Sequence, residues 1–427
     1  MHVWIFQTGE PIHLDPGQPR PMRAMNLANM LVQQGHRVTL WTSAFHHQQK
    51  THRSRLAESH RVNDLLEIRL IPSNGYKRNI GLERLYDHFQ LALNLGRELK
   101  NEKVAPDIGF VGYPPIEFAY VAIRWLKSKN IPIVLDAKDQ WPHIFIDASP
   151  RSLRGLVFLM FLPYFVLGRV ALRNATAFSS VSQSFLYWME SYSGRSLSED
   201  DIVAPLSPIA ERIGAQDRRD AALFWRKLSI YGNDKIRFVF VGSLSQAFDF
   251  GPISELAKKA EKGGLDWEFI ICGDGPERTN IEELFIGCGN TIFPGWVDRA
   301  QISVVMRYST MGLAPYKRSK DFLDSIPNKI IDYLSHDTPI LTSLSGEVGS
   351  LIRQHNCGLV YSKSDAEELF IQMQTLASDA NRLRNMGSCA NQIFNKMFAG
   401  EAVYKKLAYD LERLVEKGAR GKKTDEG

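Results

Sequence analysis

The sequence predicts an α/β protein built from two doubly wound domains, each with a parallel sheet covered by helices. Its 427 residues are too many for one ordinary core and fit two domains of about 200 residues each. Strand patterns alternate with helical patterns from the start, and the alternation begins again near Phe238, after the linker at 205–208. We therefore expect an N-terminal domain at 1–205, a C-terminal domain at 206–395, and a final helix with a basic tail at 396–427.

The first half opens with a strand, a loop, a helix and a second strand, which is how a parallel doubly wound sheet begins. Residues 3–7 form a short apolar run, residues 8–19 are rich in Gly and Pro, and residues 22–34 carry apolar side chains at helical spacing. Gly35 then ends the helix. Further strands are expected at 38–41, 66–71, 108–111, 131–135, 177–181 and 202–204, with helices at 82–99 and 116–127.

The second half repeats this alternation. Strands are expected at 238–241, 267–272, 291–293, 311–314, 339–342 and 358–360, with helices between them and further helical patterns from residue 366 onward. Open α/β sheets bind ligands at the carboxyl ends of their strands, so two such domains predict a ligand cleft between them. The basic segment 417–423 is expected to be a frayed, solvated end.

The composition is that of a soluble globular protein, with 44% hydrophobic and 23% charged residues. A net charge of +5 suits an acidic ligand or an anionic membrane surface, but it is too small to indicate nucleic acid. The four cysteines, at 272, 288, 357 and 389, show no close pairing, so neither a disulfide framework nor a zinc site is indicated.

The N-terminus has no basic segment before its short apolar run, so we interpret that run as a strand and not as a signal peptide. No segment reaches the roughly 18 apolar residues of a membrane span. These features favour a protein of the reducing cytoplasm.

The stretch 313–343 leads from a charged loop into a short helix and then a strand. Pro327 suits the first turn of a helix at 326–335, and the free N–H groups of that turn, with Asn328 and Lys329, predict a phosphate site. Asp324 and Asp332 can both face one ligand, where carboxylates would accept from sugar hydroxyls. The alternative is that Asp324 is a solvated loop charge and Asp332 complements the helix.

This acid pair resembles the double-glutamate motif of the retaining glycosyltransferases of family 4, which have the two-domain GT-B fold. The resemblance is best over 237–343, where FVFVGSLSQAFDFGPISELAKKA, EFIICGDGPE, FPGWVD and PNKIIDYLSHDTPILTS follow in the family's order. It implies a hexosyltransferase of the kind that builds bacterial cell-surface polysaccharides, acting on a nucleotide-sugar donor. Asp332 would then hydrogen-bond the donor ribose, Asp324 would belong to the catalytic site, and Lys329 would contact the diphosphate.

Two glycine turns and one aromatic residue complete the expected donor side. Tight strand-to-helix turns are predicted at Gly242-Ser243 and at Gly273 to Gly275, and GDGPE lacks the third glycine and downstream acid of an NAD enzyme. Trp296-Val297 resembles the family's loop that meets the nucleobase. Where the family carries basic residues, this chain has Ser243 and Phe250, so we assign the diphosphate to Lys329, with Lys317, Arg318 and Lys320 as nearby candidates.

The acceptor or diphosphate side is expected around the first loop, at Gly9, Arg20 and Arg23. Guanidinium groups at the start of a helix can bind a diphosphate or an acidic acceptor, although both arginines can also be plain surface charges. The histidines of HHQQKTHR, residues 46–53, lack an ordered ligand spacing with carboxylates, so we expect no metal. No other cofactor is expected, because the nucleotide-sugar is a substrate.

The segment VLDAKDQWP, residues 134–142, places Lys138 and Asp139 just past a strand. It is similar to the RDxWP element of relatives that glycosylate lipid-linked acceptors, with Lys where the pattern has Arg. The resemblance implies that Asp139 orients the acceptor hydroxyl or the transferred sugar. Alternatively, Asp139 caps a helix or pairs with Lys138.

Residues 153–175 form the most apolar stretch of the chain, and every residue from 156 to 167 is apolar or aromatic. Arginines flank it at 151, 154, 169 and 173, and Pro163 interrupts it. The pattern predicts a helix lying in an anionic membrane interface, with a buried core helix as the alternative. The resemblance adds a polyprenyl-linked acceptor at the inner face of the cytoplasmic membrane.

Two other functions fit the same sequence features. One is a nucleotide-sugar epimerase or a phosphorylase on the same two-domain fold. The other is a catalytically silent partner that binds a nucleotide-sugar or a lipid, because the family's basic residues are replaced at Ser243 and Phe250.

Overall fold

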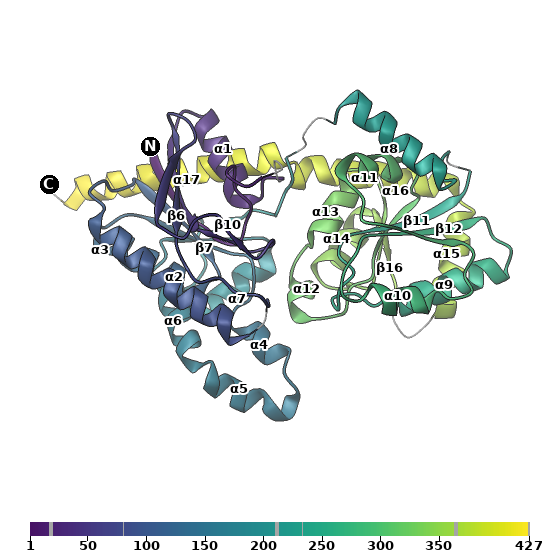
Figure 1. The fold of residues 1–427 in the computed structure, drawn as a ribbon, viewed down its shortest axis with the longest axis horizontal. Helices are drawn as coiled ribbons and strands as arrows, with labels where there is room; N and C mark the ends of the chain where they lie inside the picture. The colour runs from purple at the N-terminus through teal and green to yellow at the C-terminus, as the bar shows by residue number, and fades with distance from the viewer. Residues whose placement is uncertain (17–19, 80, 210–212, 233, 363–365, 426–427) are drawn as a thin grey trace. The chain divides into compact units, whose positions relative to one another are not determined.

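The computed structural model describes residues 1–427 except 17–19, 80, 210–212, 233, 363–365 and 426–427 (Figure 1). The chain divides into two compact units. Unit 1 consists of Met1–Leu206 together with Gly400–Gly427, and unit 2 consists of Ser207–Ala399. The chain passes from unit 1 to unit 2 after Leu206 and returns to unit 1 after Ala399, so the final helix belongs to unit 1.

Unit 1 is built on an eight-stranded sheet with the strand order β10-β9-β8-β7-β1-β2-β6-β5. All neighbouring strands run parallel except β5, which is antiparallel to β6. The strands are β1 (His2–Phe6), β2 (Arg37–Ser43), β5 (Glu58–Arg61), β6 (Leu66–Ile71), β7 (Ile108–Tyr113), β8 (Ile133–Ala137), β9 (Ala177–Ser180) and β10 (Ile202–Val203). A separate short hairpin pairs β3 (Phe45–His46) with β4 (Thr51–His52).

Helices pack on this sheet because their apolar faces match its buried strands. The helices of unit 1 are α1 (Arg23–Gln33), α2 (Leu82–Asn101), α3 (Ile116–Ser128), α4 (His143–Asp147), α5 (Arg154–Met160), α6 (Leu162–Arg173), α7 (Gln183–Ser193) and α17 (Gly400–Asp425). Aromatic rings fill much of the core: Trp4 stacks on Trp125 with ring centroids 5.0 Å apart, and Phe6 stacks on Trp41 at 6.0 Å.

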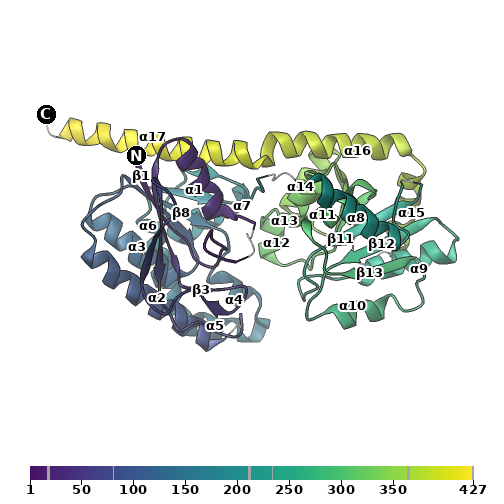
Figure 2. The ribbon, with the colours of Figure 1, turned by 45° about the horizontal axis from the view of Figure 1, so that its top comes forward.

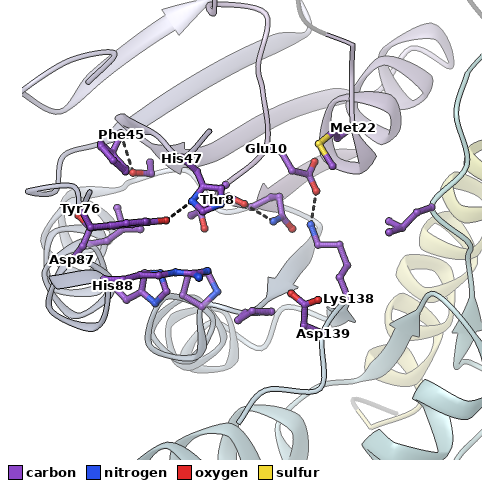
Figure 3. Close-up of a pocket in the computed structure, with 18 residues that line it drawn as sticks. Thr8, Glu10, Met22, Phe45, His47, Tyr76, Asp87, His88, Lys138 and Asp139 are labelled. Carbon is purple, nitrogen blue, oxygen red and sulfur yellow. Dashed lines mark hydrogen bonds and ion pairs between the residues drawn. The ribbon is translucent and has the colours of Figure 1, made fainter. Parts of the chain in front are cut away.

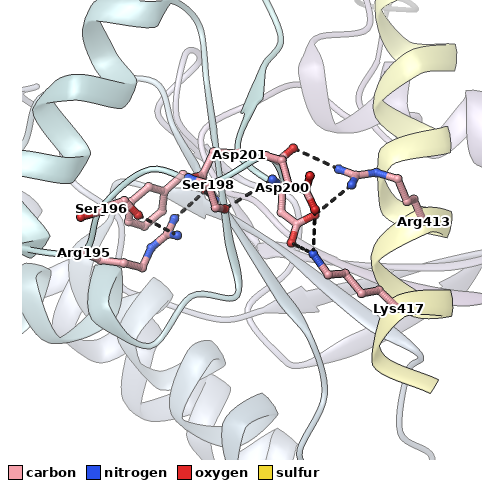
Figure 4. A network of polar contacts seen from close by, with 9 residues as sticks. Arg195, Ser196, Ser198, Asp200, Asp201, Arg413 and Lys417 are labelled. Carbon is pink, nitrogen blue, oxygen red and sulfur yellow. Dashed lines mark hydrogen bonds and ion pairs between the residues drawn. The ribbon is translucent and has the colours of Figure 1, made fainter. Parts of the chain in front are cut away.

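The C-terminal helix α17 packs beside α1 (Figures 1 and 2). Its Arg413 and Lys417 hold Asp200 at 2.9 Å and 2.7 Å, and Lys417 also reaches Glu199 at 3.2 Å (Figure 4). Apolar residues on its other turns, including Leu407, are buried. The expectation of a frayed end from residue 417 is therefore wrong, because the helix continues to Asp425 and Lys417 is held by ion pairs.

Helices α5 and α6 carry the apolar stretch. Among the described residues, no single helix is both long and apolar enough to cross a membrane; Arg151–Met160 and Leu162–Arg173 meet those criteria only when taken together, across a 67° bend. Pro163 lies in the first turn of α6. No residue of α5 is buried, so the alternative of a core helix is wrong for this segment, whereas α6 buries one face that includes Phe165 and Leu172.

Unit 2 contains a six-stranded sheet with the order β13-β12-β11-β14-β15-β16, in which every pair is parallel. The strands are β11 (Ile236–Val241), β12 (Trp267–Cys272), β13 (Thr291–Gly295), β14 (Met311–Ala314), β15 (Ile340–Thr342) and β16 (Gly358–Val360). The helices are α8 (Ala215–Lys227), α9 (Gly251–Lys262), α10 (Arg278–Leu284), α11 (Arg299–Arg307), α12 (Lys320–Asp324), α13 (Asn328–Leu334), α14 (Glu347–His355), α15 (Ala366–Ala377) and α16 (Ala380–Ile393). Figure 2 shows α8 beside α11, against which it packs.

Two doubly wound, mostly parallel sheets confirm the predicted fold class. In each unit the chain first builds the sheet outward on one side and then crosses to the other, and ligand sites of open α/β sheets lie where this reversal occurs. The reversal falls between β1 and β7 in unit 1 and between β11 and β14 in unit 2. Ligand sites are therefore expected at these two places, at the carboxyl ends of β1 and β11.

Candidate functional site

In unit 2, the strand β11 ends at Val241 and the chain turns at Gly242. The φ angle of Gly242 is +142°, and a Cβ atom at this position would lie 1.7 Å from the Nζ atom of Lys329. Only glycine therefore lets Lys329 reach the end of the strand in this conformation.

A second glycine turn packs directly against the first. Gly273 follows β12 with a φ of +136°, and a Cβ there would lie 1.9 Å from the carbonyl oxygen of Gly242. Gly275 approaches the backbone of Leu244 in the same way. The structure thus brings together Gly242, Gly273 and Gly275, which the sequence placed on the donor side.

Lys329 is the charged centre of this region. Its ammonium group donates a hydrogen bond to the carbonyl oxygen of Val241 and lies 4.2 Å and 5.0 Å from the ring centroids of Phe240 and Phe248. Burial lowers the pKa of Lys329 to about 8, and the negative charge of Asp332 opposes this shift. A cation held mainly by a carbonyl and two aromatic faces can stabilise a phosphate strongly.

The helix that carries Lys329 also carries Asp332. Helix α13 begins at Asn328 with Pro327 as its N-cap, two residues later than the start predicted at 326. Asp332 follows Lys329 by one turn, so the two side chains share a helix face, and Asp332 is half-buried. Burial raises the pKa of Tyr316, and the negative charge of Asp332 adds to this rise.

Asp324 lies at the end of the preceding helix, α12. Its Oδ2 atom pairs with Nζ of Lys320 at 2.6 Å. The alternative that Asp324 is a solvated charge in a loop is therefore wrong, because Asp324 lies in a helix and forms an i,i+4 ion pair there. Lys320 is one of the nearby cations that the sequence indicated, and another, Arg318, donates from Nε to the carbonyl oxygen of Ser343 at 3.0 Å.

The loop after β13 separates the two residues expected at the nucleobase. The Trp296 side chain is 74% exposed, whereas Val297 is buried in the core of unit 2. The indole of Trp296 is therefore available to a ligand and the Val297 side chain is not. Of the positions where the family has basic residues, Ser243 is exposed and Phe250 is buried in the core.

In unit 1, a cavity of about 260 Å³ lies at the reversal between β1 and β7 (Figure 3). Gln7, Thr8 and Gly9 line it from the end of β1, and Pro114 and Pro115 line it from the end of β7. Lys138 and Asp139, which follow β8, complete this part of the wall. The structure thus brings Gly9, Lys138 and Asp139 to one cavity, and their role toward an acceptor stays a prediction.

Arg23 requires a correction, because it holds unit 1 together and does not face a ligand. Its side chain is 2% exposed and forms a bidentate ion pair with Asp136, with both N···O distances 2.6 Å. The remaining N–H groups donate to Ala204 O, Pro205 O and Ser179 Oγ. Every guanidinium N–H is therefore already used. Arg20 is exposed and does not line the cavity.

Lys138 and Asp139 differ in their partners. Lys138 pairs with the buried carboxylate of Glu10. Neither alternative for Asp139 occurs in the described part of the chain, since Lys138 is paired with Glu10 and α4 is capped by Pro142. The surrounding protein desolvates the Asp139 carboxyl at the cavity wall and raises its pKa, against the attraction of Lys138 and Arg84.

Sequence reasoning missed the opposite wall of the cavity, which consists of His47, Tyr76, Arg84 and His88. These residues come from loops and from one face of α2, with no motif around them. Of the histidine cluster considered as a metal site, His46 instead lies 3.4 Å from Asp15, which also binds Arg53. Over the residues that the structure describes, no group of three or more His, Cys, Asp or Glu could hold a metal ion.

Comparison with known proteins gives one family match and many similar folds. Residues 235–379 match the family model described as glycosyl transferases group 1. A Bacillus subtilis (strain 168) protein, TuaH, assigned to teichuronic acid biosynthesis as a glycosyltransferase, is 27% identical over 115 residues. That match covers 26% of this chain and 28% of TuaH, so it spans little more than a quarter of the curated relative.

Two solved structures resemble nearly the whole chain. Sucrose-phosphate synthase from Thermosynechococcus elongatus has a TM-score of 0.71 at 14% identity, covering 97% of this chain and 99% of that chain. HepE of Anabaena in complex with UDP-glucose has a TM-score of 0.63 at 13% identity, covering 97% of this chain and 100% of that chain. Because the first match covers 97% of this chain, it extends over both units.

Proposed function

Because the chain has the GT-B fold and residues 235–379 match the family model of glycosyl transferases group 1, we propose that this protein transfers a sugar from a nucleotide-diphosphate-sugar to a hydroxyl group with retention. The acceptor in this proposal is a lipid-linked glycan, and the product belongs to a surface polysaccharide. The partial match to TuaH, assigned to teichuronic acid biosynthesis, supports the polysaccharide part.

The observation that carries the proposal is the position of Lys329 against Gly242, on which the turn at Gly273 packs, at the sheet reversal of unit 2. A diphosphate bound here would give the ammonium group of Lys329 a charged partner in place of the neutral carbonyl oxygen of Val241. Negative charge on the diphosphate grows as the glycosidic bond breaks, so Lys329 would stabilise the transition state more than the bound donor. The fold that holds UDP-glucose in HepE supports a donor of this class.

The remaining donor contacts in this proposal come from Asp332, Asp324 and Trp296. Asp332 accepts from the ribose hydroxyls, because it shares a helix face with Lys329 and would lie one turn from the diphosphate. Asp324 accepts from the transferred sugar, and the exposed Trp296 stacks on the nucleobase. No covalent nucleophile takes part, and electrostatic stabilisation of the departing diphosphate is the main contribution.

The membrane part of the proposal rests on helices α5 and α6. Their large apolar side chains are exposed, with Leu156 at 66%, Leu159 at 64% and Val166 at 56%. Contiguous exposed apolar surface of this kind marks an interaction site. The four arginines at 151, 154, 169 and 173 flank it and suit anionic head groups, so we propose peripheral binding at the inner face of the cytoplasmic membrane.

Acceptor-dependent release of nucleoside diphosphate tests the enzymatic proposal. The purified protein is incubated with UDP-glucose and other nucleotide-sugars, with and without a polyprenyl-diphosphate-linked glycan. We expect release only when acceptor is present, and a product with the donor's anomeric configuration by NMR. Donor conversion without acceptor would indicate an epimerase, phosphate-dependent cleavage a phosphorylase, and donor binding with no release in any mixture a silent partner.

Vesicle flotation tests the membrane proposal. We expect the protein to float with anionic vesicles at low salt and to be partly released by added salt. The variant Leu156→Ser/Leu159→Ser should lose flotation, while Leu223→Ser, at a 55% exposed leucine on α8, should not. We change these leucines and not Phe161, because Phe161 stacks on Phe145 at 4.6 Å and supports the fold. Protein that stays in the soluble fraction at low salt would contradict the proposal.

A further inference from the structure

The cavity of unit 1 has two walls of different chemistry. Figure 3 shows Tyr76, Asp87 and His88 on one side and Lys138 and Asp139 on the other. On the Lys138 side, the positive charge is neutralised by the ion pair with Glu10. On the Tyr76 side, Arg84 forms no ion pair within 4.0 Å with any described residue.

Arg84 provides the first cation of this wall. Its guanidinium lies 5.2 Å from the Trp141 ring and 5.7 Å from the Tyr76 ring, and Nη1 donates to the carbonyl oxygen of Asn79 at 2.8 Å. Across the part of the chain that the structure describes, no carboxylate pairs with it within 4.0 Å. Its positive charge is thus held in place by aromatic faces, and the carboxyl groups of Asp87, Glu117 and Asp139 act on it only from beyond ion-pair distance.

Lys50 provides a second cation beside this wall, although its side chain does not line the cavity itself. Its ammonium group lies 4.5 Å from the Tyr76 ring centroid and donates to Asn79 Oδ1 at 2.5 Å. Tyr76 therefore carries a cation on its ring from both Lys50 and Arg84, and its hydroxyl is hydrogen-bonded to His47 Nδ1.

The two histidines of this wall are neutral and offer N–H donors. Burial, followed by the charges of Lys50 and Arg84, lowers the pKa of His47 to about 4, and burial, followed by Arg84, lowers that of His88 to about 3. His88 Nε2 accepts from Arg84 Nε at 3.4 Å, which places the proton on Nδ1. That Nδ1 atom is buried and has no hydrogen-bond partner among the described residues.

A guanidinium without an ion-pair partner lies beside an N–H donor without an acceptor, and a group with negative charge and several acceptor oxygens would satisfy both. We infer that this wall binds the acceptor through a phosphate or diphosphate group, held by Arg84 and His88, with Lys50 adding positive charge from its position against the Tyr76 ring. The inference rests on the proposed function, in which the acceptor is a lipid-linked glycan. A volume of about 260 Å³ is small for a whole glycolipid and fits such a head group.

Two carboxyl groups near this wall do not prevent anion binding. Asp87 accepts from the backbone N–H of Gly75 at 2.6 Å, and burial raises its pKa. Asp139 lies on the opposite wall, where it can accept from a hydroxyl group of the same acceptor. The anion and the reacting hydroxyl would then lie on opposite sides of the cavity.

Isothermal titration with geranyl phosphate, geraniol and inorganic phosphate tests the inference, with UDP saturating the donor site of unit 2. We expect geranyl phosphate to bind at least tenfold more tightly than geraniol, and Arg84→Gln to remove at least tenfold of that affinity. Arg97→Gln removes the same charge from an exposed position on the same helix and should bind as the wild type does. Lys50→Gln should weaken binding severalfold, and it serves as the test if Arg84→Gln fails to fold.

The titration with inorganic phosphate identifies whether the bound anion is a lipid-linked head group or a free phosphate. Arg84-dependent binding of geranyl phosphate alone supports a lipid-linked head group, and Arg84-dependent binding of inorganic phosphate as well supports recognition of the free group. Equal binding of geraniol and geranyl phosphate, or unchanged binding in both Arg84→Gln and Lys50→Gln, would overturn the inference. Because the readout is binding, Arg84-dependent affinity without donor turnover would overturn the proposed function alone, and turnover without Arg84-dependent affinity would overturn this inference alone.

Discussion

The sites at the ends of the two sheets are built from different parts of the chain. In unit 2, the backbone of Gly273 packs on that of Gly242, and Gly242 in turn lies against Lys329, with no room for a Cβ atom at either glycine. In unit 1, the cavity depends on side chains such as Arg84 and His88 and on the balance of their charges. Substitutions in the first should therefore act through steric displacement with large effects, and substitutions in the second through charge with smaller ones.

The largest effect is expected for Gly273→Ala. The new Cβ would meet the carbonyl oxygen of Gly242 at 1.9 Å, so the backbone of both turns must move. We expect donor turnover to fall at least about a hundredfold, with a loss of about 1–3 kcal/mol in the free energy of unfolding. Gly264→Ala is the control, because Gly264 also has a positive φ but no atom lies within 4 Å of its Cβ position. Equal turnover losses in both variants would show that backbone strain alone is responsible.

Lys329→Ala should come next, with turnover reduced about a hundredfold to a thousandfold and donor affinity reduced less. Gly242→Ala displaces the same ammonium group, since its Cβ would lie 1.7 Å from Nζ. The double variant should therefore be little worse than either single variant in steady-state kinetics. Lys258→Ala, at an exposed ion pair on α9, is the control. An unaltered turnover number in Lys329→Ala would remove Lys329 from the mechanism.

Asp332→Ala should lower donor affinity by about 1.5–3 kcal/mol, the usual contribution of a hydrogen bond to a charged group. We expect turnover at saturating donor to change little and the protein to stay folded. Calorimetric titration of the donor measures the effect, and Glu255→Ala, on the exposed surface of α9, is the matched loss of one carboxylate. Donor affinity equal to that of the wild type would contradict a ribose contact.

The smallest effect concerns pH. The pKa of Lys329 is lowered from 10.5 to about 8 in the folded chain, so the ammonium is lost above pH 8 and donor affinity should fall as pH rises. The unfolded chain binds this proton more tightly, so between about pH 8 and 10.5 the Lys329 contribution to stability increases with pH. Deprotonation of Lys329 therefore does not destabilise the fold in this pH range, and the fall in donor affinity is not a consequence of unfolding. Lys329→Arg should flatten the profile, and an unchanged profile would assign it to another group.

The backbone-built site of unit 2 and the side-chain-built cavity of unit 1 also differ in how well the sequence predicts them. The strands β6, β12, β14 and β16 occupy the predicted residues, because each is a short, mostly apolar run bounded by turn or loop residues. The strand β5, with the sequence ESHR, was missed because it is a polar edge strand with no apolar alternation. The turns at Gly242 and Gly273 were predicted because close backbone approach requires glycine wherever it occurs.

Side-chain sites depend on partners that lie far apart in the chain. Arg23 was expected to bind a ligand, but its partner Asp136 is 113 positions away and no local pattern connects them. Arg84 was missed because an arginine on an amphipathic helix has the same local pattern whether it faces solvent or a cavity. Only the fold shows that its charge lies against Tyr76 and His88.

Hydrogen exchange with each ligand separately tests the central claim, that the donor binds at the glycine turns of unit 2 and the acceptor in the cavity of unit 1. With UDP-glucose, we predict slower amide exchange in residues 241–244, 273–275 and 295–297. With geranyl phosphate, we predict slower exchange in residues 47–50 and 76–88. Protection by UDP-glucose confined to unit 1, or protection of the same segments by both ligands, would contradict the account.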